Sequence, residues 1–282
     1  QNHNPRYHLV LLVKNNQGYK NIVKLASQAH IKGFYMKPRI NWELLEQYHE
    51  GLICSSACLG GEVLQHLLKN DYEGAKAVAK RFKDLFGEDY YIELQDHGLE
   101  DQKRTNPDLI RIAKELDIKM IITNDSHYLN KEDADWHDTL LCMQTKSSKS
   151  DPNRFHFSNN EFYVKKVSEL RDAFKWLDSE TFDECIKNTV DICKKCHITV
   201  EWKAPLPDFP VPEGFTTDTY LEKLVYQGIK RKYHQEEIAP NLMERAKYEL
   251  GVIEQMGFSA YFLITWDFIH YAKTHDIPVG PG

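Results

Sequence analysis

The alternation of short apolar runs with amphipathic helical patterns is the feature that most narrows the folds open to this chain. Over about the first 130 residues, apolar runs of strand length are separated by segments whose apolar residues recur at helical spacing. The expected strands are 9–13, 52–55, 90–94 and 120–123, and the expected helices are 19–30, 42–48, 62–68, 72–86 and 106–116. This order predicts an α/β fold in which crossover helices connect parallel strands, as a barrel or an open sheet.

The pattern becomes helical after residue 130. Residues 131–202 read as helices, apart from an irregular polar stretch at 145–160. In the expected helix 182–197, the side chains of Ile186, Val190 and Cys193 recur at a spacing that predicts one buried face.

A proline-rich segment predicts a domain boundary. Four prolines fall between residues 205 and 212, and such a run can neither continue a helix nor donate sheet hydrogen bonds. We expect an extended connector there, followed by helices over 218–233, 242–255 and 261–274. Aromatic residues in the last helix could stack on bases, but at helical spacing they are more often core.

Composition bounds the class of protein. The chain has 282 residues, 41% hydrophobic and 28% charged, which is typical of a soluble globular protein. No apolar run reaches membrane-spanning length, and six irregularly spaced cysteines favour a reducing compartment, so we expect a cytoplasmic protein without a membrane partner. The net charge of -6 argues against a chain-wide basic surface for nucleic acid but leaves a local basic groove open. Both ends are abrupt, and we expect a segment of a longer polypeptide.

Residues able to bind a metal follow three of the expected strands. Asp125 and His127 end the apolar run 120–123, and in extended backbone such positions point the same way. Cys58 follows the second strand and His97 the third. Sulfur, nitrogen and oxygen donors together suit Zn, or Mn and Fe at an oxygen-rich site.

Each of these residues also has a plainer interpretation. Asp125 could cap the next helix, with His127 half-exposed beside it. This segment alone favours neither the metal site nor the capped loop. Cys58 alone would be a small buried thiol, and His97 alone a hydrogen-bonded histidine. The glycines of Gly280-Pro-Gly282 could begin a phosphate-binding loop, although a turn is the simpler interpretation.

Several sequence motifs occur along the chain in the order in which one protein family has them. They are Tyr7-His-Leu-Val-Leu-Leu-Val-Lys-Asn-Asn-Gln-Gly-Tyr19, Glu50-Gly-Leu-Ile, Ser56-Ala-Cys-Leu-Gly-Gly-Glu62, Thr123-Asn-Asp-Ser-His-Tyr-Leu129, Gln255-Met-Gly-Phe-Ser-Ala-Tyr-Phe-Leu-Ile264 and Ile277-Pro-Val-Gly-Pro-Gly282. Together they resemble the alpha subunits of bacterial DNA polymerase III, the C-family replicative polymerases.

The resemblance implies a domain plan. Residues 1–203 would be a polymerase-and-histidinol-phosphatase (PHP) domain that lacks its first strands, an incomplete (β/α)7-like barrel with a mostly helical segment after it. Residues 204–215 would be the connector, and 216–282 the start of the polymerase palm. The palm aspartates that hold the catalytic Mg²⁺ would lie beyond Gly282, so no catalytic residue is expected here.

The resemblance also implies site residues. His8, Cys58, Asp125 and His127 match metal-ligand positions of the family, and His97 is carried over as a further candidate. Zn or Mn held there would support 3′–5′ exonuclease proofreading, but the site is incomplete because the family's His-x-His strand and further upstream ligands do not appear. Gly280 and Gly282 match the start of a nucleotide-binding loop.

Three hypotheses follow. The first is a segment of a DNA-directed DNA polymerase, with a DNA primer-template, deoxynucleoside triphosphates, a sliding clamp and a clamp loader as partners, and with no activity as an isolated chain. The second is a stand-alone metal-dependent phosphoesterase, which leaves the proline connector and later helices unexplained. The third is a non-catalytic scaffold.

Overall fold

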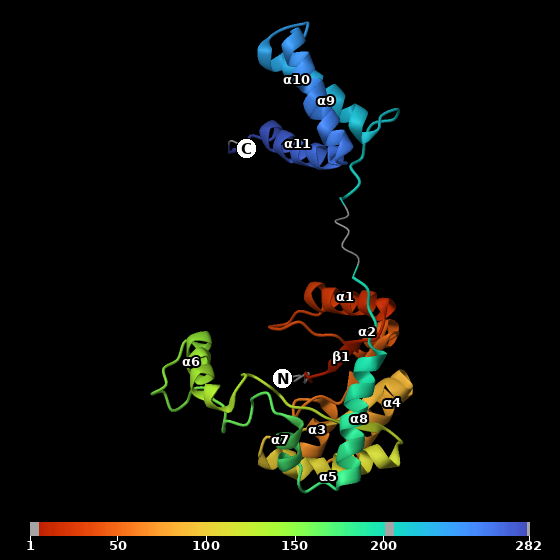
Figure 1. Ribbon diagram of the computed structural model, residues 1–282, viewed down its shortest axis with the longest axis vertical. Coiled ribbons are helices and arrows are strands. Elements are labelled where there is room, and N and C mark those ends of the chain that lie inside the picture. Colours follow the sequence, from red (N-terminus) through yellow and green to blue (C-terminus); the bar gives the residue numbers. More distant parts are fainter. Residues whose placement is uncertain (1–5, 201–205, 281–282) are drawn as a thin grey trace. The chain divides into compact units, whose positions relative to one another are not determined.

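The protein consists of two compact units, residues 1–200 and 201–282. The structure is a computed structural model that describes residues 6–200 and 206–280 (Figure 1). Each unit is considered by itself below. The assignment of 1–203 to a PHP domain, 204–215 to a connector and 216–282 to a palm stays a prediction.

The first unit is built on a four-stranded sheet. Its strands are β1 (Val10–Val13), β2 (Leu52–Ser55), β3 (Tyr90–Leu94) and β4 (Lys119–Ile122), in the spatial order β1-β2-β3-β4. β2 pairs with β3, and β3 with β4, in parallel. The α/β class is therefore confirmed, whereas closure of a barrel stays a prediction.

The expectation of parallel strands is wrong for β1, which runs antiparallel to β2 with Val10 opposite Ser55. The reason lies in the connection, which contains α1 (Asn16–Ile31) and α2 (Trp42–Tyr48). This connection brings the chain back to the end of the sheet that it left, so β2 runs in the opposite direction to β1. Lys14 N donates to Gly51 O at 2.9 Å, which shows that β2 starts where β1 stops.

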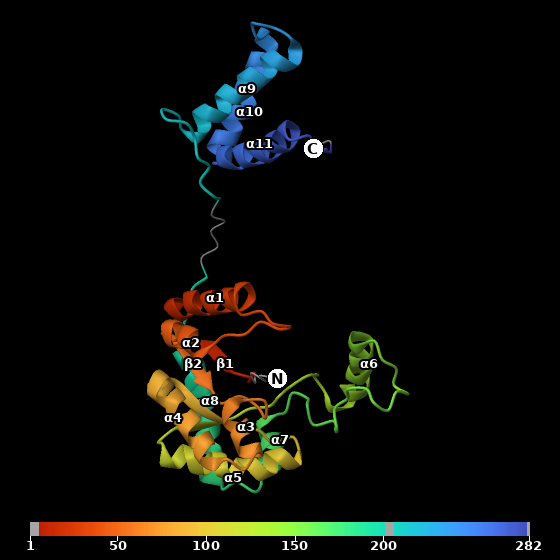
Figure 2. The same cartoon turned by 180° about the vertical axis from the view of Figure 1, so that it is seen from behind.

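Three helices pack together on one face of the sheet (Figures 1 and 2). They are α3 (Glu62–Leu68), α4 (Tyr72–Phe86) and α5 (Glu100–Glu115); a short 3-10 helix, Gly87–Asp89, follows α4. Alternate residues of each strand enter this main core, as Tyr90, Ile92 and Leu94 do from β3. The intervening strand residues form a smaller cluster on the other face: Ile53, Tyr91 and Ile121, with Ile192.

Helix α8 (Ser179–Lys195) lies against β4. The predicted buried face is correct only at Ile186, which packs against the core, because Val190 is 49% exposed and Cys193 is also exposed. The helix instead buries Phe182, Cys185 and Asn188. Asn188 Nδ2 donates to Met120 O at 2.9 Å, so a polar side chain occupies the buried face in order to pair with the backbone of β4.

The segment between β4 and α8 is mostly irregular. It contains the 3-10 helix Lys131–Asp133, α6 (Ala134–Thr145) and α7 (Val167–Ala173). Within the first unit, α6 and its loops stand off from α3, α4 and α5 in both views (Figures 1 and 2).

The second unit contains α9 (Thr217–Tyr233), α10 (Pro240–Gln255) and α11 (Ser259–Thr274). Thr216 caps α9 by accepting a hydrogen bond from Thr219 N. Leu263 of α11 is fully buried, but the core role expected for the aromatic residues is wrong: Tyr261, Phe268 and Tyr271 are each more than half exposed. Among the described helices, none combines the length and the apolar character needed to cross a bilayer.

Candidate metal centre

The carboxyl ends of β2, β3 and β4 bring three loops to one edge of the sheet. Because these strands are parallel, the segments 55–58, 95–97 and 123–127 all begin at that edge. The candidate ligands Cys58, His97, Asp125 and His127 therefore belong to neighbouring loops.

His8 lies beside Cys58, although it precedes its strand. The distance from His8 Nδ1 to Cys58 Sγ is 3.3 Å. His8 N donates to Gly60 O at 2.8 Å, which fixes the histidine backbone against the loop after β2. A Cβ at residue 60 would come within 2.9 Å of the His8 ring, so glycine leaves the room that the imidazole occupies.

Asp125 and His127 form the second pair. His127 Nε2 lies 3.2 Å from Asp125 Oδ1, and both side chains are exposed. His127 N donates to Phe162 O at 2.7 Å, so the later segment around Phe162 holds this loop. The Phe162 ring lies 6.1 Å from that of His127 and stacks at 4.7 Å on that of His97.

His97 is buried, with 1% of its surface exposed. Its Nε2 accepts a hydrogen bond from Asp125 N at 3.1 Å, and its Nδ1 lies 3.0 Å from Gln102 Nε2. Burial and the charge of Lys165 lower the pKa of His97, although Asp125 and Gln102 act in the opposite direction. Both ring nitrogens thus have protein partners, and His97 positions the backbone of Asp125.

Glu93 is a buried carboxylate that the sequence reasoning passed over. It accepts hydrogen bonds from Ser55 Oγ and Thr123 Oγ1, and at 2.9 Å from Gln95 Nε2. One carboxylate therefore ties together residues from β2, β3 and the end of β4. The available signal was an acidic residue inside the otherwise uncharged run Tyr90–Leu94.

The candidate ligands stand as two pairs. Within residues 6–200 and 206–280, no group of three or more His, Cys, Asp or Glu side chains could hold a metal ion. Zinc takes about four donors and manganese about six, so a pair supplies at most half of a coordination sphere. The donor types suit these metals, but the residues present do not complete a site.

Two family descriptions match separate parts of the chain. The "PHP domain" family matches residues 1–97, and the "Bacterial DNA polymerase III alpha NTPase domain" family matches residues 219–282. A protein of Borreliella burgdorferi named DNA polymerase III subunit alpha is 45% identical over 98% of this chain and 24% of its own length. The chain is a homologue of the DNA polymerase III alpha subunits.

Other alpha subunits show the same relationship. Those of Treponema pallidum and Thermus aquaticus are 43% and 36% identical over 98% of this chain, and over 23% and 27% of their own lengths. The chain thus spans about a quarter of the length of these curated relatives. The resemblance to DNA polymerase III alpha subunits, which rested on the sequence motifs, is confirmed.

The predicted nucleotide-binding residues stay predictions. Gly280 is exposed, and a Cβ added there would meet nothing within 4 Å, so the described structure does not itself require glycine at this position. Gly282 lies outside the described residues.

Proposed function

We propose that this chain is part of a replicative DNA-directed DNA polymerase, a nucleotidyltransferase. The supporting observation is that a PHP match and an alpha-subunit match occur in order along one chain, and that 98% of the chain aligns with 24% of the length of the Borreliella burgdorferi alpha subunit. A stand-alone PHP phosphoesterase would leave the second match, and the helices α9 to α11, without a role.

The substrates of this proposal are a DNA primer-template and deoxynucleoside triphosphates, used in the cytoplasm. Mg²⁺ would serve polymerisation through the palm aspartates of such a polymerase. A sliding clamp and a clamp loader are the proposed protein partners. By itself the chain is proposed to be inactive in both synthesis and exonuclease proofreading.

For the first unit, we propose that His8, Cys58, Asp125 and His127 contribute donors to a Zn or Mn centre. The neighbouring loops and the two close pairs support this, and a bound ion would supply Lewis-acid chemistry toward phosphodiesters. His97 and Glu93 would hold the loops in register. The donors in the described part of the chain do not complete a coordination sphere.

A scaffold role is the second candidate, and one observation favours it. No three-ligand group exists in the described part of the chain, as a domain that had lost its metals would also show. In that case Glu93 and His97 would serve only to hold the three loops together.

Primer extension by a chimera tests the polymerase proposal. The aligned segment of the Borreliella burgdorferi subunit would be replaced by this chain, and extension of a primed template would be measured with Mg²⁺ present. We expect a rate of the same order as that of the unmodified subunit, because 45% identity preserves the fold and the internal contacts. The chain alone should extend no primer.

The chimera's circular dichroism and gel-filtration volume serve as the folding control. A chimera that folds like the unmodified subunit but extends no primer would contradict the proposal. Extension by the isolated chain would contradict its predicted inactivity.

Metal titration tests the proposed ligands. We expect Zn or Mn to bind the chain weakly, and Cys58→Ser and Asp125→Asn each to weaken binding by about tenfold or more, since changes merely in the outer shell of a site cost about 10- to 100-fold. Calorimetry on the dialysed chain gives the affinities. Cys193→Ser is the matched control, because that thiol is exposed and lies on α8. Equal affinities for the parent and both ligand variants would favour the scaffold.

A further inference from the structure

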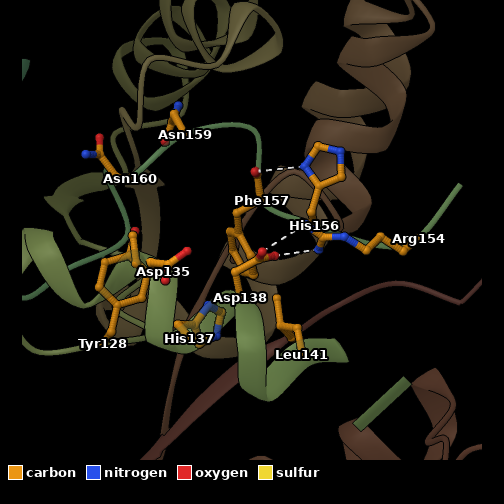
Figure 3. A pocket seen from close by; sticks show the side chains of 11 residues that line it. Tyr128, Asp135, His137, Asp138, Leu141, Arg154, His156, Phe157, Asn159 and Asn160 are labelled. Carbon is orange, nitrogen blue, oxygen red and sulfur yellow. Dashed lines mark hydrogen bonds and ion pairs between the residues drawn. The ribbon is translucent and has the colours of Figure 1, made fainter. Parts of the chain in front are cut away.

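A pocket of about 280 Å³ lies between α6 and the loop 154–160 (Figure 3). Its lining includes Tyr128, Asp135, His137, Asp138, Arg154 and Phe157. Drug-sized ligands occupy pockets of about 300–1,000 Å³, so this one suits a single small ring system. Nothing in the metal-centre proposal uses it.

The charged groups around the pocket are already paired. Arg154 holds both oxygens of Asp138, at 2.5 and 2.8 Å, as the dashed lines of Figure 3 show. The other lining carboxylate, Asp135, is paired at 2.7 Å with Lys149. A free phosphate or a metal cation would therefore compete with one of these ion pairs, whereas a neutral ligand would not.

Aromatic rings gather on the same pocket. The His137 ring lies 5.2 Å from that of Tyr128 and 5.1 Å from that of Phe157. These separations fall within the range of aromatic contacts, and all three rings belong to the pocket lining, where a planar ligand could pack against them. The side chain of Asn160, which is exposed, adds an amide donor and acceptor at the rim.

The pocket adjoins the proposed metal ligands. His127 lies with its ring 4.8 Å from that of Phe157 and 5.6 Å from that of His137. A group held in the pocket would thus sit next to the Asp125–His127 pair.

We propose that this pocket takes one unstacked nucleobase, at the end of a single DNA strand. The class of ligand follows from the pocket's size, its paired charges and its aromatic lining, because base stacking on aromatic side chains needs no particular sequence. The inference rests on the proposed function in one respect, since that function supplies DNA as the substrate. The inference extends the proposed function by placing the terminal base beside the candidate metal ligands.

Fluorescence of 2-aminopurine tests the proposal. A short single-stranded oligonucleotide with 2-aminopurine at its 3′ end would be titrated with the 282-residue chain in EDTA, so that the readout is independent of metal. We expect quenching on binding, and affinity about 5- to 150-fold weaker for His137→Ala and for Phe157→Leu, as the loss of base stacking predicts. Phe157→Leu keeps apolar bulk in case the shorter side chain at residue 137 disturbs folding. His30→Ala, on the exposed side of α1, is the control.

Three outcomes would overturn the proposal. The first is equal binding by the parent of an abasic 3′ end and of the 2-aminopurine end, and the second is unchanged affinity in both pocket variants. The third is a free 2-aminopurine deoxynucleotide that competes as well as the oligonucleotide, which would assign the pocket to mononucleotides. Any of these could occur while the chimera still extends primers, so failure here is distinguishable from failure of the polymerase proposal.

Discussion

Replacing Glu93 with alanine is expected to lower the free energy of unfolding of the first unit by about 3 kcal/mol or more. The carboxylate is buried and accepts hydrogen bonds from Ser55, Gln95 and Thr123. Its removal would leave these donors without their partner, and each unsatisfied buried donor costs about 1–3 kcal/mol. The loops that carry the candidate ligands would lose their common anchor at the same time.

Urea unfolding followed by far-ultraviolet circular dichroism measures this effect. Glu93→Gln should cost less than the alanine variant, because its amide keeps the shape and one accepting oxygen. Glu100→Ala is the control, since the Glu100 side chain is 88% exposed. A loss below about 1 kcal/mol for Glu93→Ala would show that water replaces the carboxylate and that the network is not structural.

Substituting alanine for Gly18 should destabilise the same unit by about 3 kcal/mol or more. A Cβ at this position of α1 would come within 1.9 Å of Gly51 O. Neither partner can move freely, because Asn15 Oδ1 caps the helix through Gly18 N and Gly51 takes a positive φ of 73°. The whole helix would have to shift away from the start of β2.

Two control substitutions isolate this clash. Ser27→Ala, on the exposed side of α1, should leave stability nearly unchanged or slightly raised. Gly228→Ala, in α9, meets nothing within 4 Å and should stabilise the second unit by about 0.5–1 kcal/mol. Thermal unfolding of each variant gives the ranking, and a Gly18→Ala protein as stable as the Ser27→Ala protein would contradict the packing described here.

Local elements could be predicted from the sequence because their signals are local. The strands β2 and β3 and the helices α2, α3 and α4 lie where periodicity placed them. Helix α5 begins at Glu100, six residues before the predicted start at 106. The prediction missed its first turns because their buried residues, Gln102 and Thr105, are polar and form hydrogen bonds. Apolar spacing does not register such a face.

Features that depend on distant partners were missed. The direction of β1 relative to β2 depends on where the chain re-enters the sheet, which is beside the end of β1 at Gly51. The buried face of α8 depends on a hydrogen bond from Asn188 to β4. The exposed aromatics of α11 carry the same helical spacing as a core stripe, so the pattern alone could not separate the two cases.

The candidate site was partly accessible from the sequence. Positions after parallel strands must meet at one edge, which brought Cys58, His97 and the Asp125–His127 pair to neighbouring loops. The pairing of His8 with Cys58 depends on antiparallel β1 and on Gly60, and the pocket beside His127 depends on the irregular segment 146–160, where periodicity carries no information.

The distance along the chain between β4 and α8 bears on how the protein emerges from the ribosome. β4 ends at Ile122, whereas the helix that lies against it extends to Lys195, about 70 residues later. At a translation rate of about 5–20 residues per second, roughly 4–15 s would pass between the synthesis of β4 and that of the end of α8. During this interval the face of β4 that carries Ile121 would lack the cover of α8, and this exposed apolar surface could contact a neighbouring nascent chain.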